Sequence, residues 1–289
     1  NTYNPVIAAW PGGRVWALSS PSNNRLNNQI VATSNGGNNW LIHPIPAEGY
    51  TINSVSSPSE NIIWIAGSNG NNGYIGKTTN GGINWNSVNL PMPPYGVDKI
   101  IFANLNTGWA FYRLGNMFRT TNSGSSWVLL ANPLVETYCG SFINEHTGWV
   151  GGTTIIKTTN GGDNWITQTL PPASQPIQAI KMLNSLSGYA CGSRILVKTS
   201  NGGITWDSVL IPFPYNNIMF TTLDCFDINN IIVAGLGPDI IHSTNGGTNW
   251  IAEYTGAVEI HGLSMFASDS AYAVTSSGHV LRMKTDEVV

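Results

Sequence analysis

The sequence predicts an all-β fold, a seven-bladed β-propeller of four-stranded antiparallel blades. One turn motif, of which "KTTNGGDNW" at 157–165 is an example, recurs six times at intervals of 38 to 45 residues. That period matches one propeller blade and is too short and turn-rich for the paired helices of a solenoid. No stretch shows helical hydrophobic periodicity over more than two turns, and the 32 glycines and 16 prolines lie mainly between strand-like runs.

Each copy of the motif has an Asn in the turn and a Trp five residues later. Asn-Gly suits a tight turn because both residues tolerate positive φ, and the Asn side chain can bond the turn's own backbone. The Trp is expected to begin the outer strand and to cover the hairpin against its neighbour. The motif contains no acid, base or nucleophile for catalysis, so we predict a structural role for Asn35, Trp40, Asn80, Trp85, Asn122, Trp127, Asn160, Trp165, Asn201, Trp206, Asn245 and Trp250.

A second pattern precedes each motif. Short aromatic or β-branched runs follow a polar turn, as in "NIIWIAG" at 61–67 and "HTGWVGG" at 146–152. Further apolar runs, such as "DKIIFA" at 98–103, come before them, and all of these read as strands. The predicted unit is therefore strand, turn, strand, loop, strand, motif turn, strand.

No linker or low-complexity segment interrupts the series, so we predict one domain, 1–289. Its blades are expected at roughly 1–46, 47–92, 93–133, 134–172, 173–213, 214–254 and 255–289. The last blade has three strand-like runs between residues 256 and 285 and no motif. We expect "NTYN" (1–4) or "DEVV" (286–289) to supply its fourth strand, because a closed ring leaves no exposed sheet edge.

The composition excludes several classes of protein. Charged residues make up 9% of the chain and the net charge is −3, so electrostatic binding of nucleic acid or of an anionic membrane is not expected. No apolar run approaches the roughly 18–20 residues that cross a bilayer. No cofactor motif or metal-ligand spacing occurs, so we expect neither a cofactor nor a metal. For Cys139, Cys191 and Cys225, buried free thiols are favoured over one disulfide with a spare thiol, and over metal binding.

The motif also resembles that of a known family. The pattern [Ser/Thr]-x-Asn-x-Gly-x-x-Trp, seen in Thr78–Trp85 and its five counterparts, resembles the Asp-box, also called the BNR repeat, with Asn in place of Asp. The longer pattern around "KTTNGG" is similar to the propellers of photosystem II stability and assembly factors. The resemblance implies a structural box remote from the active face, in propellers that include sialidases, other glycoside hydrolases, sorting receptors and assembly factors. A sialidase is not expected, since the six arginines show no signature of its arginine triad.

The loops that lead into each innermost strand are expected to gather at one mouth of the channel and to form a binding surface. Several contain proline and end near a tyrosine, as in "IPFPYNN", and rigid loops with tyrosines suit recognition. The carboxylates on these loops leave glycoside cleavage open, because that reaction needs two carboxylates roughly 5–10 Å apart. The candidate binding residues are Glu48, Tyr50, Tyr95, Asp98, Glu136, Tyr138, Tyr215, Glu259 and His261. The other histidines, His43, His146, His242 and His279, are interpreted as surface or turn residues.

These features favour a non-enzymatic propeller that binds a protein partner or forms part of a larger assembly. A carbohydrate-binding or glycoside-hydrolysing propeller is the alternative, and a photosystem-type assembly factor is a minor one. The weakly charged, Asn- and Thr-rich composition favours an extracellular or cell-surface location, with the periplasm left open. The first residues, "NTYNPVIAAW", are expected to start a mature chain, and the lack of Asn-x-Ser/Thr acceptors favours a bacterial source.

Overall fold

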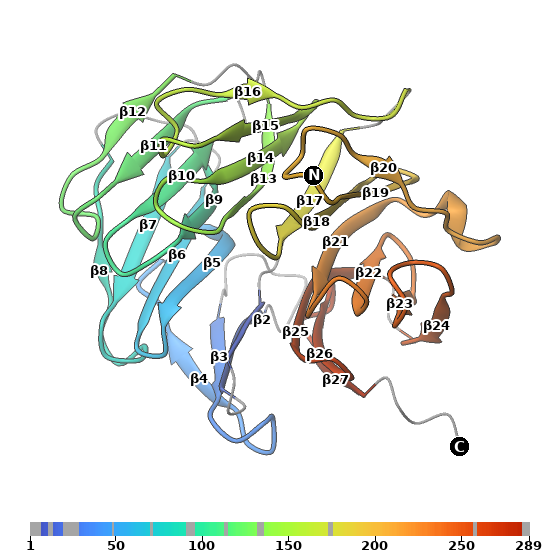
Figure 1. The fold of residues 1–289 in the computed structure, drawn as a ribbon. Helices are drawn as coiled ribbons and strands as arrows, with labels where there is room; N and C mark the ends of the chain where they lie inside the picture. Colours follow the sequence, from blue (N-terminus) through green and yellow to red (C-terminus); the bar gives the residue numbers. More distant parts are fainter. Residues whose placement is uncertain are drawn as a thin grey trace.

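The chain forms a ring of seven β-sheet blades in this computed structural model, which confirms the predicted fold class (Figure 1). The blades follow one another around the ring in sequence order, so the first blade lies beside the last. The structure describes residues 7–10, 14–19, 29–47, 49–69, 72–90, 96–112, 115–131, 136–172, 176–256 and 259–284.

Six blades have four strands, each paired antiparallel with its neighbours in sequence order. The first two consist of β1 (Ile7–Trp10), β2 (Arg14–Ser19), β3 (Gln29–Thr33) and β4 (Leu41–Pro44), then β5 (Thr51–Ser59), β6 (Ile62–Ser68), β7 (Gly73–Thr78) and β8 (Asn86–Ser87). The next two consist of β9 (Val97–Phe102), β10 (Gly108–Tyr112), β11 (Met117–Thr120) and β12 (Val128–Leu130), then β13 (Thr137–Phe142), β14 (Gly148–Gly152), β15 (Ile155–Thr158) and β16 (Ile166–Thr167).

The fifth and sixth blades are separated by a 3-10 turn, and the seventh has three described strands. These elements are β17 (Ile177–Met182), β18 (Gly188–Gly192), β19 (Ile195–Thr199), β20 (Asp207–Ser208), η1 (Tyr215–Asn217), β21 (Phe220–Cys225), β22 (Ile231–Gly235), β23 (Asp239–Ser243), β24 (Ile251–Tyr254), β25 (Ile260–Ala267), β26 (Ser270–Thr275) and β27 (Val280–Lys284). Each outer strand starts one residue after its motif Trp, so the Trp precedes that strand instead of beginning it.

The antiparallel order of each blade assigns its loops to two faces of the ring. Successive turns of such a sheet alternate between its two ends. The loops that enter the innermost strands therefore share one face with the loops that join second to third strands, and we call this the mouth face. The motif turns share the opposite face, the motif face, with the turns that join first to second strands.

Packing between neighbouring blades supplies the core. Seven clusters of buried hydrophobic residues lie one at each blade interface, including the interface between the seventh blade and the first. Five of the second strands, β10, β14, β18, β22 and β26, are buried along their whole length, because a blade covers each of their sides. Every motif Trp contributes to one of these interface clusters, which agrees with the expected covering role.

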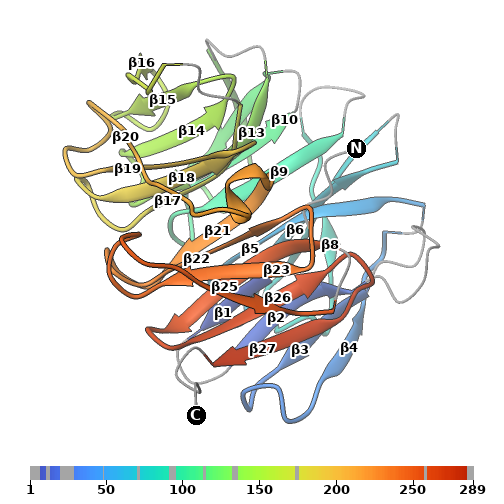
Figure 2. The same ribbon diagram turned by 90° about the vertical axis from the view of Figure 1, so that its right-hand side faces the viewer.

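The ring closes where β1–β4 meet β25–β27 (Figure 2). Ile7 and Val15 of the first blade pack against Tyr272 and Val274 of the seventh. Both segments that we expected to complete the seventh blade, 1–4 and 286–289, lie outside the described residues. Within the described ranges the two ends of the ring are joined by side-chain packing and by a hydrogen bond from Arg282 to the first motif turn.

Candidate functional site

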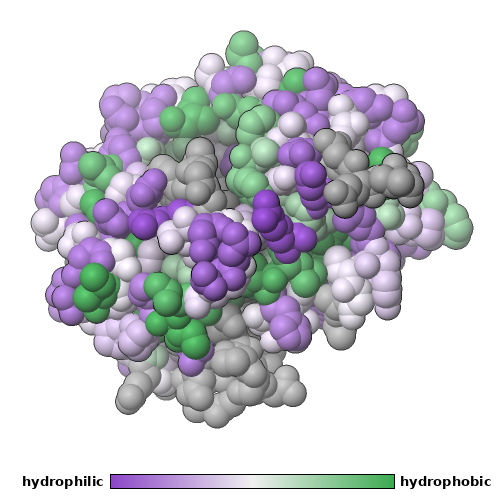
Figure 3. Space-filling view, turned by 90° about the horizontal axis from the view of Figure 1, so that it is seen from below, coloured by the Kyte–Doolittle hydropathy of each residue, from purple (hydrophilic) through white to green (hydrophobic). Residues whose placement is uncertain are grey.

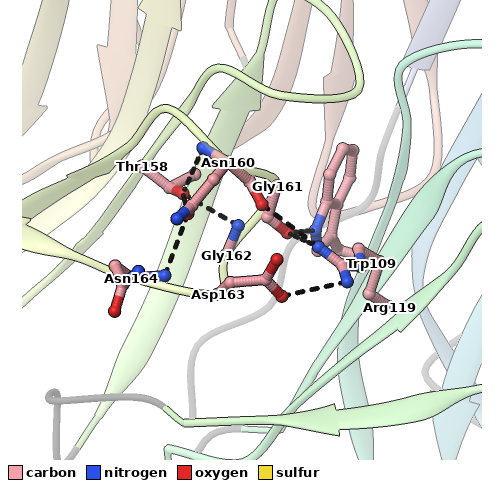
Figure 4. Close-up of polar contacts among 8 residues, drawn as sticks. All are labelled: Trp109, Arg119, Thr158, Asn160, Gly161, Gly162, Asp163 and Asn164. Atoms are coloured by element: carbon pink, nitrogen blue, oxygen red, sulfur yellow. Dashed lines mark hydrogen bonds and ion pairs between the residues drawn. The ribbon is translucent and has the colours of Figure 1, made fainter.

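The six motif turns share one hydrogen-bond network, shown for the fourth blade in Figure 4. Thr158 Oγ1 donates to Asn160 Oδ1 (3.0 Å) and accepts from the Gly162 N–H (2.8 Å). Asn160 Oδ1 also accepts from the N–H of Asn164 (2.9 Å). The same bonds recur in the other five copies, with Ser243 in place of the Thr in the sixth blade. The hydroxyl and the amide oxygen thus fasten the turn, and neither group is an acid or a base.

The left-handed residues of the turn are the two that follow the Asn. Gly161 and Gly162 have φ of 73° and 102°, whereas no motif Asn has positive φ. The expectation that Asn and the first Gly take positive φ is therefore wrong for the Asn. In the third blade the first left-handed position is held by Ser123, with φ of 56°. The Asn stays in ordinary backbone geometry while its side chain accepts from the N–H four residues ahead.

A basic side chain of one blade holds the motif turn of the next blade. In Figure 4, Arg119 Nη1 donates to the carbonyls of Asn160 (3.2 Å) and Gly161 (3.1 Å), and its Nη2 lies 3.0 Å from Asp163 Oδ1. Trp109 Nε1 donates to the same Gly161 carbonyl at 2.9 Å. Charge-assisted hydrogen bonds of this kind are the stronger ones in proteins.

This contact, which we call the basic latch, repeats around the ring. It is made by Lys77 to Ser123, Lys157 to Gly202, Lys198 to Gly246, and Arg282 to Gly36, in each case to a main-chain oxygen of the next motif turn. In the first blade Ala32 occupies the latch position, and Arg14 contacts Glu60 and Asn61 of the second blade instead. The Arg282 bond joins the last blade to the first. From the sequence, the arginines were weighed only against a sialidase triad, and no contact was assigned to Arg119 or Arg282.

At the latch position of the sixth blade, His242 has a different environment. It is buried, and its Nε2 lies 3.3 Å from Glu253 Oε1. The interpretation of His242 as a surface or turn residue is therefore wrong. The seventh blade, which follows, has no motif turn for a latch to hold.

The innermost strands carry a repeated β-bulge near the mouth face. In six of them one extra residue interrupts the pairing with the second strand, at Asn53, Asp98, Tyr138, Gln178, Thr221 and His261. In the second, fifth and sixth blades a glycine at the end of the second strand (Gly67, Gly192 or Gly235) comes close to the backbone that precedes the bulge; a Cβ on Gly235 would lie 2.0 Å from the Met219 carbonyl oxygen. Bulges redirect side chains and are common beside functional sites. Six polar or aromatic side chains therefore occupy one level of the ring.

A cavity of about 200 Å³ lies among the innermost strands, at the level of these bulges. Its lining includes residues from all seven innermost strands. The polar lining residues are Ser54, Lys99, Gln178, Thr221, Thr222 and His261. The cavity is therefore the part of the central channel next to the mouth face.

Two lysines of the innermost strands differ in their surroundings. Lys181 Nζ lies 2.9 Å from Asp224 Oδ1, and this carboxylate raises the pKa of Lys181. Lys99 lines the cavity and makes no ion pair with another described residue, and burial lowers its pKa. Sequence reasoning missed Lys99, although it directly follows Asp98.

The structure pairs two of the candidate carboxylates with neighbours on their own strands. The Tyr138 hydroxyl donates to Glu136 Oε2, and His261 Nε2 lies 3.1 Å from Glu259 Oε2. His261 is buried and lines the cavity, whereas the Glu259 side chain is 37% exposed. The Glu259 and His261 pair thus connects the mouth face with the channel.

The remaining candidate binding residues are less closely associated with the cavity. Tyr50 packs on Tyr74, with ring centroids 5.2 Å apart, which agrees with a packing role. Tyr215 lies in η1 and packs against the interface of the fifth and sixth blades. Asp98 is a bulge residue next to Lys99. Glu48 and Tyr95 lie outside the described residues.

Exposed apolar side chains occur in the mouth-face loops of the fifth and sixth blades. Phe213, Leu236 and Tyr254, which we call the apolar patch, are 84%, 47% and 76% exposed. Two hydrogen bonds tie their segments together: the Leu236 N–H to the Met219 carbonyl (3.1 Å), and Thr255 Oγ1 to the Pro238 carbonyl (2.7 Å). Leu210 is 85% exposed, but its carbonyl accepts from Trp250 Nε1 (3.1 Å) beside the motif turn of the sixth blade. Sequence reasoning singled out only Tyr215 from this region.

The three cysteines are buried free thiols. Burial raises the pKa of Cys139 to about 12 and also raises the pKa values of Cys191 and Cys225, so none resembles a nucleophilic thiolate.

The described ranges contain no group of three His, Cys, Asp or Glu side chains suited to a metal ion. They also contain no helix with the length and apolar character to cross a membrane.

Comparisons with known proteins agree with this fold. No protein-family model matches the chain, and no curated protein sequence is similar to it. Among solved structures, YCF48 bound to D1 peptide superposes with a TM-score of 0.76 at 18% identity, over 99% of this chain and 93% of that one. The GH74 enzyme of Niastella koreensis gives 0.79 at 14% identity, and this chain spans only 53% of its length while being covered completely. A catalytically inactive virginiamycin B lyase from Staphylococcus aureus, with quinupristin, gives 0.77 at 15% identity, over 98% and 95%.

These three proteins are about equally similar to the chain in shape, yet their names describe a peptide complex, a glycoside hydrolase and a lyase. The same fold therefore accommodates different functions, which have to be argued from the site. Identities below 20% indicate the shared architecture and leave membership in the Asp-box family an expectation. The chain is a seven-bladed β-propeller with four-stranded antiparallel blades, similar in fold to YCF48 and to GH74 propellers.

Proposed function

We propose that this chain is a non-enzymatic, secreted or surface-exposed propeller that binds a protein partner, or a larger assembly, through its mouth face. The apolar patch of Phe213, Leu236 and Tyr254 is the observation that carries the proposal. Exposed aromatic and aliphatic side chains grouped at one place are typical of protein interfaces, and aromatic residues often dominate the binding energy.

The loops under the patch are fastened before any partner binds. The Arg194 N–H donates to the Ile218 carbonyl (3.2 Å), and Tyr215 N–H donates to Pro212 (2.9 Å). Because these loops are already ordered, binding costs less conformational entropy than it does for free loops. The mechanism is rigid display of an apolar surface by two neighbouring blades.

Two further observations support this function. The hydrophobic residues visible in Figure 3 form separate patches among hydrophilic ones, as expected for contacts of limited size. A similar propeller, YCF48, is known in complex with D1 peptide, so the architecture is compatible with peptide binding. A photosystem-type assembly role is a narrower form of the same proposal. The extracellular or surface location rests on the low charge of the chain.

The first experiment measures the mass of the native particle, isolated without denaturant, by light scattering. A mass well above the 31.0 kDa of this chain, with other chains co-migrating, is expected, and a lone 31.0 kDa monomer would contradict the proposal. The second experiment compares Phe213→Ser/Tyr254→Ser with the matched pair Ile83→Ser/Ile204→Ser. Ile83 and Ile204 are 76% and 68% exposed but lie on motif turns of the opposite face.

The mouth-face pair is expected to weaken partner binding at least tenfold, since loss of an interface anchor costs more than about 1.4 kcal/mol. The motif-face pair is expected to bind as the unmodified chain does. Equal effects of the two pairs would show that the partner does not use this patch.

Carbohydrate binding or cleavage is the second candidate. It is favoured by the carboxylates of Glu136 and Glu259 at the mouth, and by the similarity in shape to a GH74 enzyme. A polysaccharide screen tests it. Cleavage that is lost on Glu136→Gln and Glu259→Gln would support an enzyme, whereas loss of protein binding without any cleavage would support the scaffold.

A further inference from the structure

The channel cavity is lined by the ammonium group of Lys99, which forms no ion pair with another described residue, although the charge of Asp98 acts on it. Lys99 follows the bulge residue Asp98 in β9 and lines the cavity. Within the described part of the chain no carboxylate lies in ion-pair range of it, whereas the comparable Lys181 has Asp224 at 2.9 Å. Protein encloses the Lys99 side chain except where it borders the cavity. Burial accordingly lowers the Lys99 pKa, because the charged form is poorly solvated there.

Gln178 is the second unused polar group of the cavity. It is the bulge residue of β17, it lines the cavity, and its amide makes no hydrogen bond to another described residue. By contrast, Ser54 Oγ accepts from the Ile100 N–H (3.0 Å), and Thr221 Oγ1 donates to the Ile260 carbonyl (3.4 Å). Lys99 and Gln178 therefore remain available to a ligand.

The charges change sign along the channel. Glu136 and Glu259 precede their innermost strands at the mouth, and Asp98 precedes Lys99 by one residue. A ligand has to pass these protein carboxylates to reach Lys99. The best match is a ligand whose own carboxylate contacts Lys99 while a positive group at its other end stays near the mouth. A ligand with several negative charges would be repelled at the mouth.

We propose that the channel cavity binds a small zwitterion of amino-acid size, with its carboxylate on Lys99 and Gln178 and its ammonium group toward the carboxylates of the mouth. The volume of about 200 Å³ is enough for such a molecule and too small for an oligosaccharide. The ligand carboxylate supplies the ion pair that Lys99 does not form with the described residues, and Gln178 can donate to the second carboxylate oxygen. This site is separate from the apolar patch and does not depend on a protein partner there.

Titration calorimetry on the full chain tests the proposal with two probes. The first is 4-aminobutyrate, and the second is 4-aminobutyramide, which has the same shape but a neutral amide in place of the carboxylate. We expect 4-aminobutyrate to bind at least tenfold more tightly than the amide at concentrations up to about 10 mM. Equal binding, or no binding of either probe, would overturn the proposal and leave a solvent-filled channel. This comparison needs no variant.

Variants then locate the site. Lys99→Met is expected to reduce 4-aminobutyrate binding at least tenfold, and Gln178→Ala to reduce it several-fold. Lys284→Met removes the same charge from β27, away from the cavity lining, and is expected to leave binding unchanged. Binding that survives Lys99→Met, or that falls equally in Lys284→Met, would contradict the assignment to the channel.

Discussion

Replacing Thr158 with valine tests how much one motif hydroxyl stabilises the ring. Thr158 is 1% exposed, and its Oγ1 accepts from the N–H groups of Asn160 (3.3 Å) and Gly162 (2.8 Å). Valine keeps the shape of the side chain and removes the hydroxyl. The Gly162 N–H is buried and then has no acceptor, whereas the Asn160 N–H is only partly buried and can turn to water.

The expected loss follows from these contacts. A buried donor without a partner costs about 1–3 kcal/mol, and the lost bond between the hydroxyl and Asn160 Oδ1 adds to this, so the free energy of unfolding should fall by about 2–3 kcal/mol. Thr158→Ser is the matched control. It keeps all three bonds and loses one buried methyl, which costs about 1 kcal/mol. The sixth blade already uses Ser243 in this way.

Urea denaturation followed by tryptophan fluorescence measures both variants, and the serine variant should have the higher midpoint. The order of the two midpoints is more informative than the size of their difference. Valine is the larger and more apolar replacement, so packing alone would make the valine variant the more stable of the two. A valine variant as stable as the serine variant would show that the hydroxyl network contributes nothing net, and would refute the role of the motif hydroxyl in fastening the turn.

Two further predictions concern the ring and its charges. Arg282→Met removes the hydrogen bond to the Gly36 carbonyl where the ring closes, and it should lower the free energy of unfolding by about 0.5–1 kcal/mol. A loss of several kcal/mol in urea denaturation would instead show that this one contact holds the ring closed. The Asp224 carboxylate raises the pKa of Lys181 above 10.5. The stabilisation of the folded chain by this ion pair is therefore complete below pH 10.5, and it is lost as the pH rises through the raised pKa. The difference in urea midpoint between the unmodified chain and Asp224→Asn should therefore be constant from neutral pH to about pH 9.5 and shrink in more alkaline solution; a difference that grows with pH would contradict this pairing.

The fold was predictable from the sequence because repetition makes each blade evidence for the others. The spacing of the motif defined the unit, and the aromatic runs placed its strands. The outer Trp residues were expected to cover the blade interfaces, and they do. Positive φ at the motif Asn was a wrong inference, because Asn-Gly is usually read as a two-residue hairpin turn, whereas in this chain the two left-handed positions come one residue later.

The bulges also left a signal in the sequence that was not used. An innermost strand with one buried face should alternate with a period of two. In β9 the buried Val97 and Ile100 are three residues apart, and so are Ile177 and Ile180 in β17. The extra residue is the bulge, and the same spacing recurs in β5, β21 and β25 but not in β13. Which side chains the bulges bring together depends on closing the ring, so Lys99 and Gln178 could not be assigned to one cavity from the sequence.

The apolar patch was missed for a different reason. Phe213 stands in a loop whose residues alternate between apolar and proline, and such runs are buried as often as they are exposed. Its surroundings depend on hydrogen bonds between segments far apart in sequence, from the Arg194 N–H to Ile218 and from the Leu236 N–H to Met219.

The basic latch makes five of the seven blade interfaces directional. Each latch-bearing blade offers a cation on one side, and each motif-bearing blade offers carbonyl oxygens on the other, so the contacts run head to tail like those between subunits of a cyclic oligomer. The seam between the last blade and the first uses the same pairing as the interfaces within the chain. A chain cut at one of these latch interfaces would therefore keep complementary ends, and the two fragments are suited to reassemble into the ring without any covalent link between them.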